Sequence, residues 1–297
     1  MKLLARVRLP ADVDVAGVSH HAVFLKGFTA HVAHAGKGEP VILLHGWPQH
    51  WWAWRHLIGP LAADGRSLIC PDLRGFGWSS TPAAGYSADQ FAADLLKLLD
   101  VLELERVDLV AHDWGAVTGF LACLQAPERF GRFIAISAPS PHLRVTPKIA
   151  FQMWRYWYQL VLGSNRLGPR AVRGLSSPRS RVARWIGMDR LQENEREVYL
   201  RQFQDEARVR ATIALYRHSV RQLLPRPLTG RYRRASLKVP TLVVHGMEDR
   251  PTHPSLIAGI EARAERMEVE ILPGVGHFLL DEAPQAVLQH VRAFLSS

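Results

Sequence analysis

The strongest local signal for chemistry is the run Val110-Ala111-His112-Asp113-Trp114-Gly115-Ala116, which sets one carboxylate between an apolar stretch and a helix-like stretch. Small neighbours allow the sharp strand-to-helix turn that raises a single side chain into a site. Raised in this way, the carboxylate of Asp113 can attack an electrophilic carbon and form an ester with it. The alternative is that Asp113 only caps the helix, because aspartate is a favoured N-cap residue.

Two more reactive residues follow apolar runs later in the chain, Asp249 first and His277 second. In the order nucleophile, acid, histidine, the histidine activates a nucleophile or water, and the acid holds the histidine in the right tautomer. We therefore predict a triad of Asp113, Asp249 and His277. Glu248 is the competitor for the role of the acid.

The motif His45-Gly46-Trp47-Pro48 follows another apolar run. The glycine before Trp47 lets a backbone N–H point into the site. We expect the amides of Trp47 and Trp114 to form an oxyanion hole for the tetrahedral intermediate that arises when water splits the ester. His45 and His112 are interpreted as structural hydrogen-bonding residues.

These residues require a scaffold in which strands alternate with helices. The predicted strands are residues 20–25, 29–33, 41–44, 67–70, 107–110, 133–136, 241–244 and 269–272. The predicted helices are residues 51–62, 88–102 after an N-cap at Ser87, 114–125 and 283–295. This alternation is typical of a parallel α/β sheet, whose ligands bind beyond the carboxyl ends of the strands.

The alternation stops at about residues 141–234, where helical patterns are rich in Trp, Tyr and Arg. We predict an α/β core made of residues 1–139 and 236–297 and a helical cap made of residues 140–235. A cap that leaves the sheet at this edge would cover the site.

Composition excludes several classes of protein. Of the 297 residues, 47% are hydrophobic and 22% are charged, which is typical of a globular protein and not of a disordered or collagen-like one. No apolar run approaches the roughly 20 residues of a membrane helix, and the N-terminus does not resemble a secretory signal. Cys70 and Cys123 are too few for a disulfide framework or a zinc site, so we expect a reducing, cytoplasmic location.

The net charge of +10 is spread unevenly. Residues 140–235 hold 19 Arg, one Lys and six acidic residues, so this segment carries the whole positive excess. We interpret it as a solvated Arg-rich surface, and the alternative is weak attraction of anionic partners or membrane surfaces. The sequence predicts neither a nucleic-acid partner nor stable membrane insertion, and it leaves monomer and homodimer open.

The chain resembles the epoxide hydrolases of the α/β-hydrolase fold, especially the actinobacterial type, which are related to haloalkane dehalogenases. The stretches that carry the resemblance are residues 45–49, 71–79, 112–115 and 276–278. It implies a mostly parallel eight-stranded sheet, flanked by helices, with an inserted helical cap and no cofactor or metal. It also implies that Asp113 opens an epoxide, and that His277 and Asp249 then activate water to release a vicinal diol.

In this family, two tyrosines of the cap donate hydrogen bonds to the epoxide oxygen. The second maps onto Tyr216, and Tyr156 is taken as the first, with Tyr158 and Trp154 as alternatives. Trp154 is also expected to contact substrate, together with Trp47 and Trp114. The aromatic residues of this segment favour a small apolar or aromatic epoxide. The resemblance further implies a cis peptide bond before Pro48.

Two other functions remain open from the sequence. A haloalkane dehalogenase would use the same aspartate and histidine and would hold the leaving halide with tryptophan N–H groups, here those of Trp114 and Trp154. A binding protein of the same fold would have no turnover at all, because fold does not dictate function.

Overall fold

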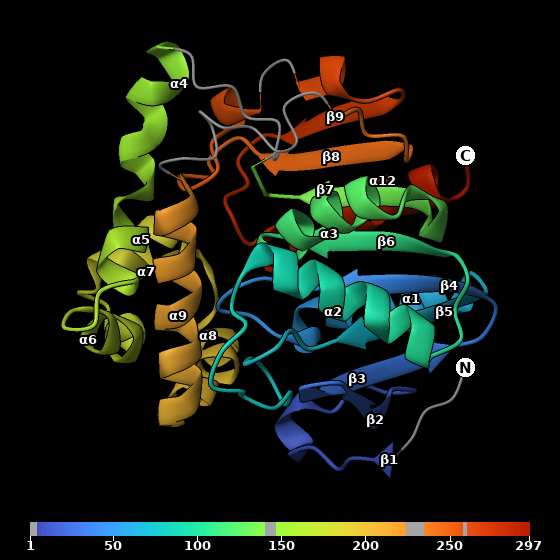
Figure 1. Cartoon of the computed structure of the whole chain (residues 1–297), viewed down its shortest axis with the longest axis horizontal. Helices are drawn as coiled ribbons and strands as arrows, with labels where there is room; N and C mark the ends of the chain where they lie inside the picture. Colours follow the sequence, from blue (N-terminus) through green and yellow to red (C-terminus); the bar gives the residue numbers. More distant parts are fainter. Residues whose placement is uncertain (1–4, 140–146, 224–234, 258–259) are drawn as a thin grey trace.

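The structure, a computed structural model, describes residues 5–139, 147–223, 235–257 and 260–297. Within these residues the centre is a nine-stranded sheet with the strand order β1-β2-β3-β5-β4-β6-β7-β8-β9 (Figure 1). The strands are β1 (Ala5–Arg6), β2 (Ser19–Leu25), β3 (Phe28–Gly36), β4 (Glu39–Leu44), β5 (Arg66–Pro71), β6 (Val107–His112), β7 (Phe130–Ile136), β8 (Thr241–Gly246) and β9 (Met267–Leu272).

The sheet is parallel from β5 to β9, and β1, β2 and β3 join it through antiparallel pairs. All eight predicted strands are present. The ninth, β1, adds one edge strand of two residues, and it is too short to show any periodicity in the sequence. The predicted count of eight therefore differs from the structure by this strand.

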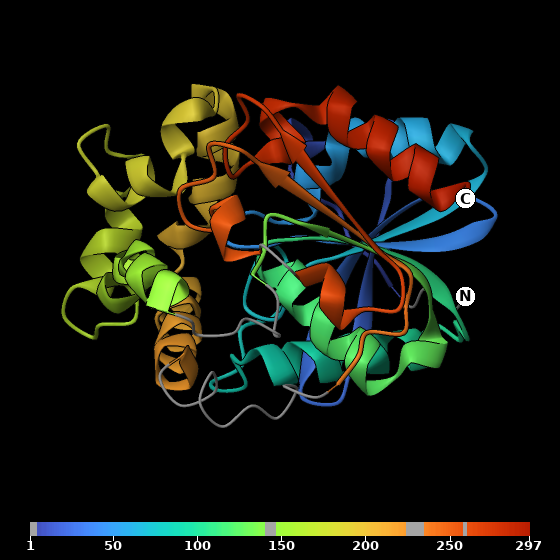
Figure 2. The ribbon, with the colours of Figure 1, turned by 90° about the horizontal axis from the view of Figure 1, so that it is seen from above.

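Helices cover both faces of the sheet. Figure 2 shows α2 (Ala88–Val101) and α3 (Trp114–Gln125) on one side and α1 (Arg55–Ala63) and α12 (Pro284–Leu295) on the other. Ser87 caps α2 as predicted, since its side chain accepts a hydrogen bond from the amide of Gln90. Short helices complete the core: η1 (Ala11–Val13), η2 (Trp51–Trp54), η3 (Pro127–Arg129), η8 (Pro254–Leu256), η9 (Ile260–Arg263) and α11 (Leu279–Glu282).

A helical segment lies between β7 and β8 in the chain and beyond one end of the sheet in space (Figure 1). Its helices are α4 (Pro147–Gln152), η4 (Met153–Tyr156), α5 (Trp157–Leu162), α6 (Gly168–Arg173), η5 (Gly174–Ser176), α7 (Arg181–Ile186), η6 (Met188–Arg190), α8 (Glu193–Leu200), η7 (Arg201–Gln204) and α9 (Glu206–Leu223). The predicted domain boundaries fall at or beside segments outside the described residues, so the domain division stays a prediction.

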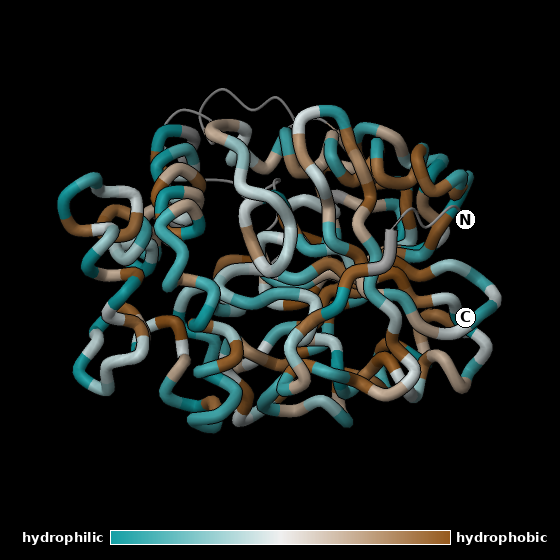
Figure 3. Tube along the Cα trace, turned by 90° about the horizontal axis from the view of Figure 1, so that it is seen from below, coloured by the Kyte–Doolittle hydropathy of each residue, from teal (hydrophilic) through white to brown (hydrophobic). Residues whose placement is uncertain are grey.

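The core explains why the strands read as unbroken apolar runs. Every residue of β6 and of β8 is buried, because helices pack on both faces of the sheet. Figure 3 shows hydrophobic stretches gathered toward the middle of the molecule and hydrophilic stretches mainly toward its outside. Cys70 and Cys123 are buried free thiols of this core. Among the described helices, none is long and apolar enough to cross a membrane.

Candidate active site

Asp113 stands on a strained turn between β6 and α3. Its backbone has φ 50° and ψ −118°, which is rare for a residue other than glycine and is typical of functional sites. A Cβ atom at Gly46 would lie 2.4 Å from the Cβ of Asp113, and one at Gly115 would lie 2.2 Å from the carbonyl oxygen of Leu44. These glycines therefore allow the turn. The Asp113 side chain makes no capping hydrogen bond, so it is not held as an N-cap.

The structure brings the three predicted triad residues together. His277 Nε2 lies 3.6 Å from Asp113 Oδ2, and His277 Nδ1 lies 3.0 Å from Asp249 Oδ2. Thr252 fixes Asp249, because its amide donates to Oδ1 at 2.9 Å and its hydroxyl donates to Oδ2 at 2.5 Å. Glu248 instead forms a half-exposed ion pair with Arg190 at 2.6 Å, so the geometry favours Asp249 as the acid.

The charges of the triad control its protonation. Burial alone would raise the pKa of Asp249, but His277 and Thr252 hold that pKa well below its usual range. Burial alone would lower the pKa of His277, but Asp249 and Asp113 together raise it to about 10. With Asp113 ionised, His277 is therefore an imidazolium between two carboxylates.

The amide of Trp47 donates a hydrogen bond of 2.8 Å to Asp113 Oδ1, as expected of one donor of an oxyanion hole. The peptide bond between Trp47 and Pro48 is cis, as the resemblance implied. The indole N–H of Trp47 donates to the hydroxyl of Thr212 on α9 at 3.0 Å. Trp47 therefore links the nucleophile to the helix that carries Tyr216.

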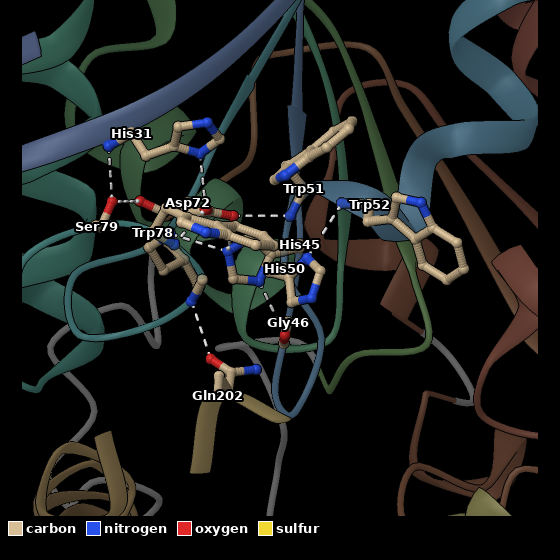
Figure 4. A network of polar contacts seen from close by, with 12 residues as sticks. His31, His45, Gly46, His50, Trp51, Trp52, Asp72, Trp78, Ser79 and Gln202 are labelled. Atoms are coloured by element: carbon tan, nitrogen blue, oxygen red, sulfur yellow. Dashed lines mark hydrogen bonds and ion pairs between the residues drawn. The ribbon is translucent and has the colours of Figure 1, made fainter. Parts of the chain in front are cut away.

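Asp72 anchors the loops around this site, although the sequence analysis assigned it no role. Figure 4 shows the fully buried carboxylate accepting hydrogen bonds from the amides of Trp51 and Trp78 at 2.8 Å and contacting His31 Nδ1 at 2.7 Å. Burial would raise its pKa, but His31 and the neighbouring His45 lower it well below its usual range. A buried acid that directly follows a strand is the signal that could have identified Asp72.

Two histidines near the triad have structural contacts, as interpreted from the sequence. His45 Nε2 accepts a hydrogen bond from the amide of Leu73 at 2.9 Å. His112 Nε2 donates to the carbonyl oxygen of His277 at 2.9 Å. Burial lowers the pKa of His112 to about 4, so this ring is neutral and holds the backbone of His277 in place.

Two tyrosines of the helical segment, Tyr158 of α5 and Tyr216 of α9, lie side by side. The Tyr216 ring lies 5.9 Å from that of Tyr158, and it also contacts Trp47 at 5.1 Å and Trp114 at 5.9 Å. Burial, with the negative charge of Asp113 as a further cause, raises the pKa of both tyrosines well above the usual value. Both hydroxyls are therefore protonated and are able to donate.

Tyr156, expected as the partner of Tyr216, lies two residues before Tyr158 and has no ring contact with Tyr216 among the described residues. The prediction assumed one continuous cap helix. The structure has the 3-10 helix η4 followed by α5, and this change of helix type alters which side chains share a face. The buried hydroxyl of Tyr156 has no hydrogen-bond partner in the described part of the chain.

Trp154 does not contact the site as predicted. Its side chain is 53% exposed, and its ring packs against Trp185 at 5.1 Å. Trp154 therefore points outward from the helical segment. The geometry does not support the expectation that it binds substrate or halide. Trp114 remains half-buried next to Tyr216.

A buried ionic network joins α1 and α11 to α8 of the helical segment. Arg55 lies 2.7 Å from Asp281 and 2.5 Å from Glu195, and Tyr199 donates to Asp281 at 2.8 Å. Burial raises the pKa of Asp281 to about 6, against the lowering effect of Arg55. The partners lie far apart in the sequence, so no local pattern indicates this network.

Within the described residues, no cluster of His, Cys, Asp and Glu is arranged to hold a metal ion.

Residues 39–284 match the family with the α/β hydrolase fold. The chain belongs to this family. It is 39% identical to epoxide hydrolase 2 of Siraitia grosvenorii over 136 residues, which cover 45% of this chain and 42% of that protein. It is 27% identical to a cis-3-alkyl-4-alkyloxetan-2-one decarboxylase of Shewanella oneidensis over 291 residues, 93% of this chain and 88% of that protein.

Among solved structures, an epoxide hydrolase from Vigna radiata superposes with a TM-score of 0.77 at 26% identity, covering 95% of this chain and 99% of that one. The alignment with epoxide hydrolase 2 spans less than half of that curated relative. The fold is therefore shared over the whole chain, whereas the closer sequence similarity is confined to part of it.

Proposed function

We propose that this protein hydrolyses epoxides to vicinal diols through a covalent ester on Asp113. The observation that carries the proposal is the pair of protonated tyrosines, Tyr158 and Tyr216, whose rings lie 5.9 Å apart and whose pKa values are raised by burial and by the charge of the Asp113 carboxylate. An epoxide needs both, because the nucleophile opens the ring and the developing alkoxide must be stabilised. The named epoxide hydrolases among the relatives support the same assignment.

In the first half-reaction, a carboxylate oxygen of Asp113 attacks one epoxide carbon and the C–O bond of the ring breaks. Tyr158 and Tyr216 donate hydrogen bonds to the oxygen, and one of them transfers its proton to it. His277, an imidazolium in the free enzyme, supplies the proton that restores this tyrosine, directly or through solvent. The products are the ester, a hydroxyl group and a neutral His277.

In the second half-reaction, neutral His277 takes a proton from water, and the water oxygen attacks the carbonyl carbon of the ester. The amides of Trp47 and Trp114 stabilise the oxyanion. The intermediate then collapses and the ester C–O bond breaks. The leaving diol oxygen takes the proton of the hydroxyl that came from water, so the Asp113 carboxylate forms again beside the His277 imidazolium. Asp249 holds the His277 ring throughout, and the cycle needs no cofactor.

We propose further that residues 140–235 form a cap whose α5 and α9 supply the two tyrosines, and that small apolar or aromatic epoxides fit beneath it. Trp47, Trp114 and Tyr216 contribute aromatic rings there. The protein acts as a monomer or homodimer in the cytoplasm, without a nucleic-acid partner or stable membrane insertion.

The decisive experiment is a single turnover of styrene oxide in water labelled with oxygen-18, with the enzyme in excess over the substrate. Attack of water on the ester carbonyl puts the label into the Asp113 peptide and leaves the first diol unlabelled. Label in the diol but not in Asp113 would overturn the ester mechanism. Asp113→Ala should form no diol, and His277→Gln should accumulate a protein heavier by the mass of one substrate.

The tyrosine assignment has a matched control within the same segment. Tyr158→Phe and Tyr216→Phe should each lower kcat/KM by about 10²-fold or more, the usual contribution of a positioned acid. Tyr156→Phe keeps the ring and should change kcat/KM by less than about threefold. Equal losses in Tyr156→Phe and Tyr158→Phe would contradict the assignment.

The opening of a strained four-membered lactone is a second candidate. Its support is the oxetanone decarboxylase, whose similarity extends over 93% of this chain. A cis-3,4-dialkyl oxetan-2-one should be offered beside the epoxides, with release of alkene and CO2 as the readout. Halide release from 1-bromobutane tests the dehalogenase reaction, which the geometry disfavours because Trp154, one of the two expected halide donors, is exposed. If no substrate gives product and His277→Gln accumulates no ester, a binding protein without turnover is favoured.

A further inference from the structure

The cap segment carries an unusual combination of charge and exposed apolar surface. Residues 151–188 contain seven Arg and no Lys, Asp or Glu. In the described part of the chain, large hydrophobic side chains are strongly exposed at six positions, and four of these lie between residues 151 and 167. These four are Phe151 at 76%, Trp154 at 53%, Leu160 at 62% and Leu167 at 53%.

Two of these side chains belong to one connected cluster on the cap surface. Phe151 and Trp154 are three residues apart, at the junction of α4 and η4, and so lie near one face of the helical segment. The Trp154 ring contacts Trp185 of α7 at 5.1 Å, and the indole N–H of Trp185 donates to the carbonyl oxygen of Arg155 at 3.0 Å. These contacts bring α7 against η4.

One guanidinium group lies near the Trp154 ring, and hydrogen bonds to backbone carbonyl oxygens link two more arginine residues to it. Arg155 lies 5.4 Å from the centre of the Trp154 ring and donates to the carbonyl oxygen of Arg250 at 3.0 Å. Arg250 in turn donates to the carbonyl oxygen of Arg184 at 2.6 Å. Within the described residues, none of the three arginines has a carboxylate partner. We call Phe151, Trp154, Arg155, Arg184 and Arg250 the aromatic–arginine cluster.

We propose that the aromatic–arginine cluster docks this protein reversibly on the surface of bilayers that contain anionic phospholipid. Tryptophan favours the headgroup level, where its ring is buried and its N–H stays wet, and phenylalanine gains by entering the acyl boundary. Arginines attract anionic headgroups, and each favours the bound state by about fivefold near an anionic leaflet. Exposed aromatic residues beside arginines that have no carboxylate partner in the described part of the chain are complementary to such a surface.

The charge pattern favours a lipid surface over two other occupants. A second copy of the chain would place the same unpaired arginines opposite one another and would be repelled. A nucleic acid would neutralise the arginines but would leave the exposed aliphatic side chains, Leu160 and Leu167, without a partner. Four of the five cluster residues lie within residues 140–235 and Arg250 follows β8, so docking brings the helical segment, with the loop after β8, to the lipid.

The test is cosedimentation of the full-length protein with extruded vesicles of phosphatidylcholine, either alone or with 30% phosphatidylglycerol. We expect binding to the anionic vesicles in 50 mM NaCl and release in 500 mM NaCl, because salt screens the attraction. Phe151→Ser and the pair Arg184→Gln with Arg250→Gln should each weaken the partition about tenfold or more. All of these changes lie on exposed side chains, and unchanged circular dichroism verifies the fold.

Matched controls separate the cluster from the general charge of the protein. Phe24→Ser, at a position that is 62% exposed on β2, and Arg266→Gln, whose side chain is 57% exposed, should leave the partition within twofold. Brominated lipid should quench wild-type fluorescence more than that of Trp154→Phe. The proposal is overturned by no vesicle binding, by equal binding to neutral vesicles, or by cluster variants that bind as the wild type does. The proposal is also overturned if the protein is a dimer that Phe151→Ser dissociates, or if the protein binds DNA but not the anionic vesicles.

Discussion

The protonation of His277 gives the sharpest test of the proposed mechanism. In the free protein the imidazolium lies 3.6 Å from the Asp113 carboxylate and 3.0 Å from Asp249, and these charges raise the pKa of His277 to about 10. Ester formation removes the charge of Asp113. Asp113→Asn removes the same charge with almost no change of shape, so this variant represents the electrostatics of the ester.

The size of the effect follows from the geometry. Two unit charges about 4 Å apart interact by about 4 kcal/mol at an effective dielectric constant of about 20. At 1.36 kcal/mol for each pH unit, loss of the Asp113 charge lowers the pKa of His277 by about 3. We therefore expect His277 to titrate near pH 7 in Asp113→Asn, whereas in the wild type it stays charged through the whole neutral range. The ester would thus lower the pKa of His277 so that, once it has given up its proton, it works as a base near neutrality.

The assay is a titration of histidine ring signals by NMR in protein labelled on its 14 histidines. The signal of His277 is assigned by its loss in His277→Gln. Asp249→Asn should also lower the pKa, because it removes the other carboxylate. Wild-type titration below pH 8, or a change of less than about one pH unit in Asp113→Asn, would refute the electrostatic reasoning.

Three further predictions concern the residues that hold the site. Gly46→Ala should abolish turnover while the protein stays folded by circular dichroism, because the added Cβ would lie 2.4 Å from the nucleophile. Arg55→Met should cost about 3–5 kcal/mol in urea unfolding at pH 8, because it leaves the buried Asp281 carboxylate without its cation, and less at pH 5, where that carboxyl is protonated. Thr212→Val removes the acceptor of the Trp47 indole and should lower stability by about 1–3 kcal/mol. A lower kcat at unchanged KM would show that it also misplaces the site.

The sequence predicted the parts of the fold that rest on local pattern. Strands buried on both faces appear as short apolar runs, and all eight were found near their predicted limits. The elbow was predictable because Asp113 needs small neighbours such as Gly115, and the order of the reactive residues indicated the triad. The two-residue strand β1 has no pattern to detect.

The remaining features depend on contacts between distant segments. Tyr158 was left as an alternative to Tyr156 because the sequence shows no sign of the change from η4 to α5 between them. Asp72 and Asp281 were not identified because their partners, such as His31 and Arg55, are brought to them only by the folded sheet. Trp154 was misplaced for the same reason, since the outward direction of its ring is set by Trp185.

One residue connects the two halves of the proposed reaction. The Trp47 amide holds Asp113, and the Trp47 indole holds Thr212 on α9. Thr212 and Tyr216 are one helical turn apart on α9, so the bond that fixes Thr212 also restrains the position of Tyr216. A shift of the cap would therefore move the proton donor and the oxyanion hole together. This coupling explains why a buried tryptophan, and not a smaller residue, stands between glycine and proline in this loop.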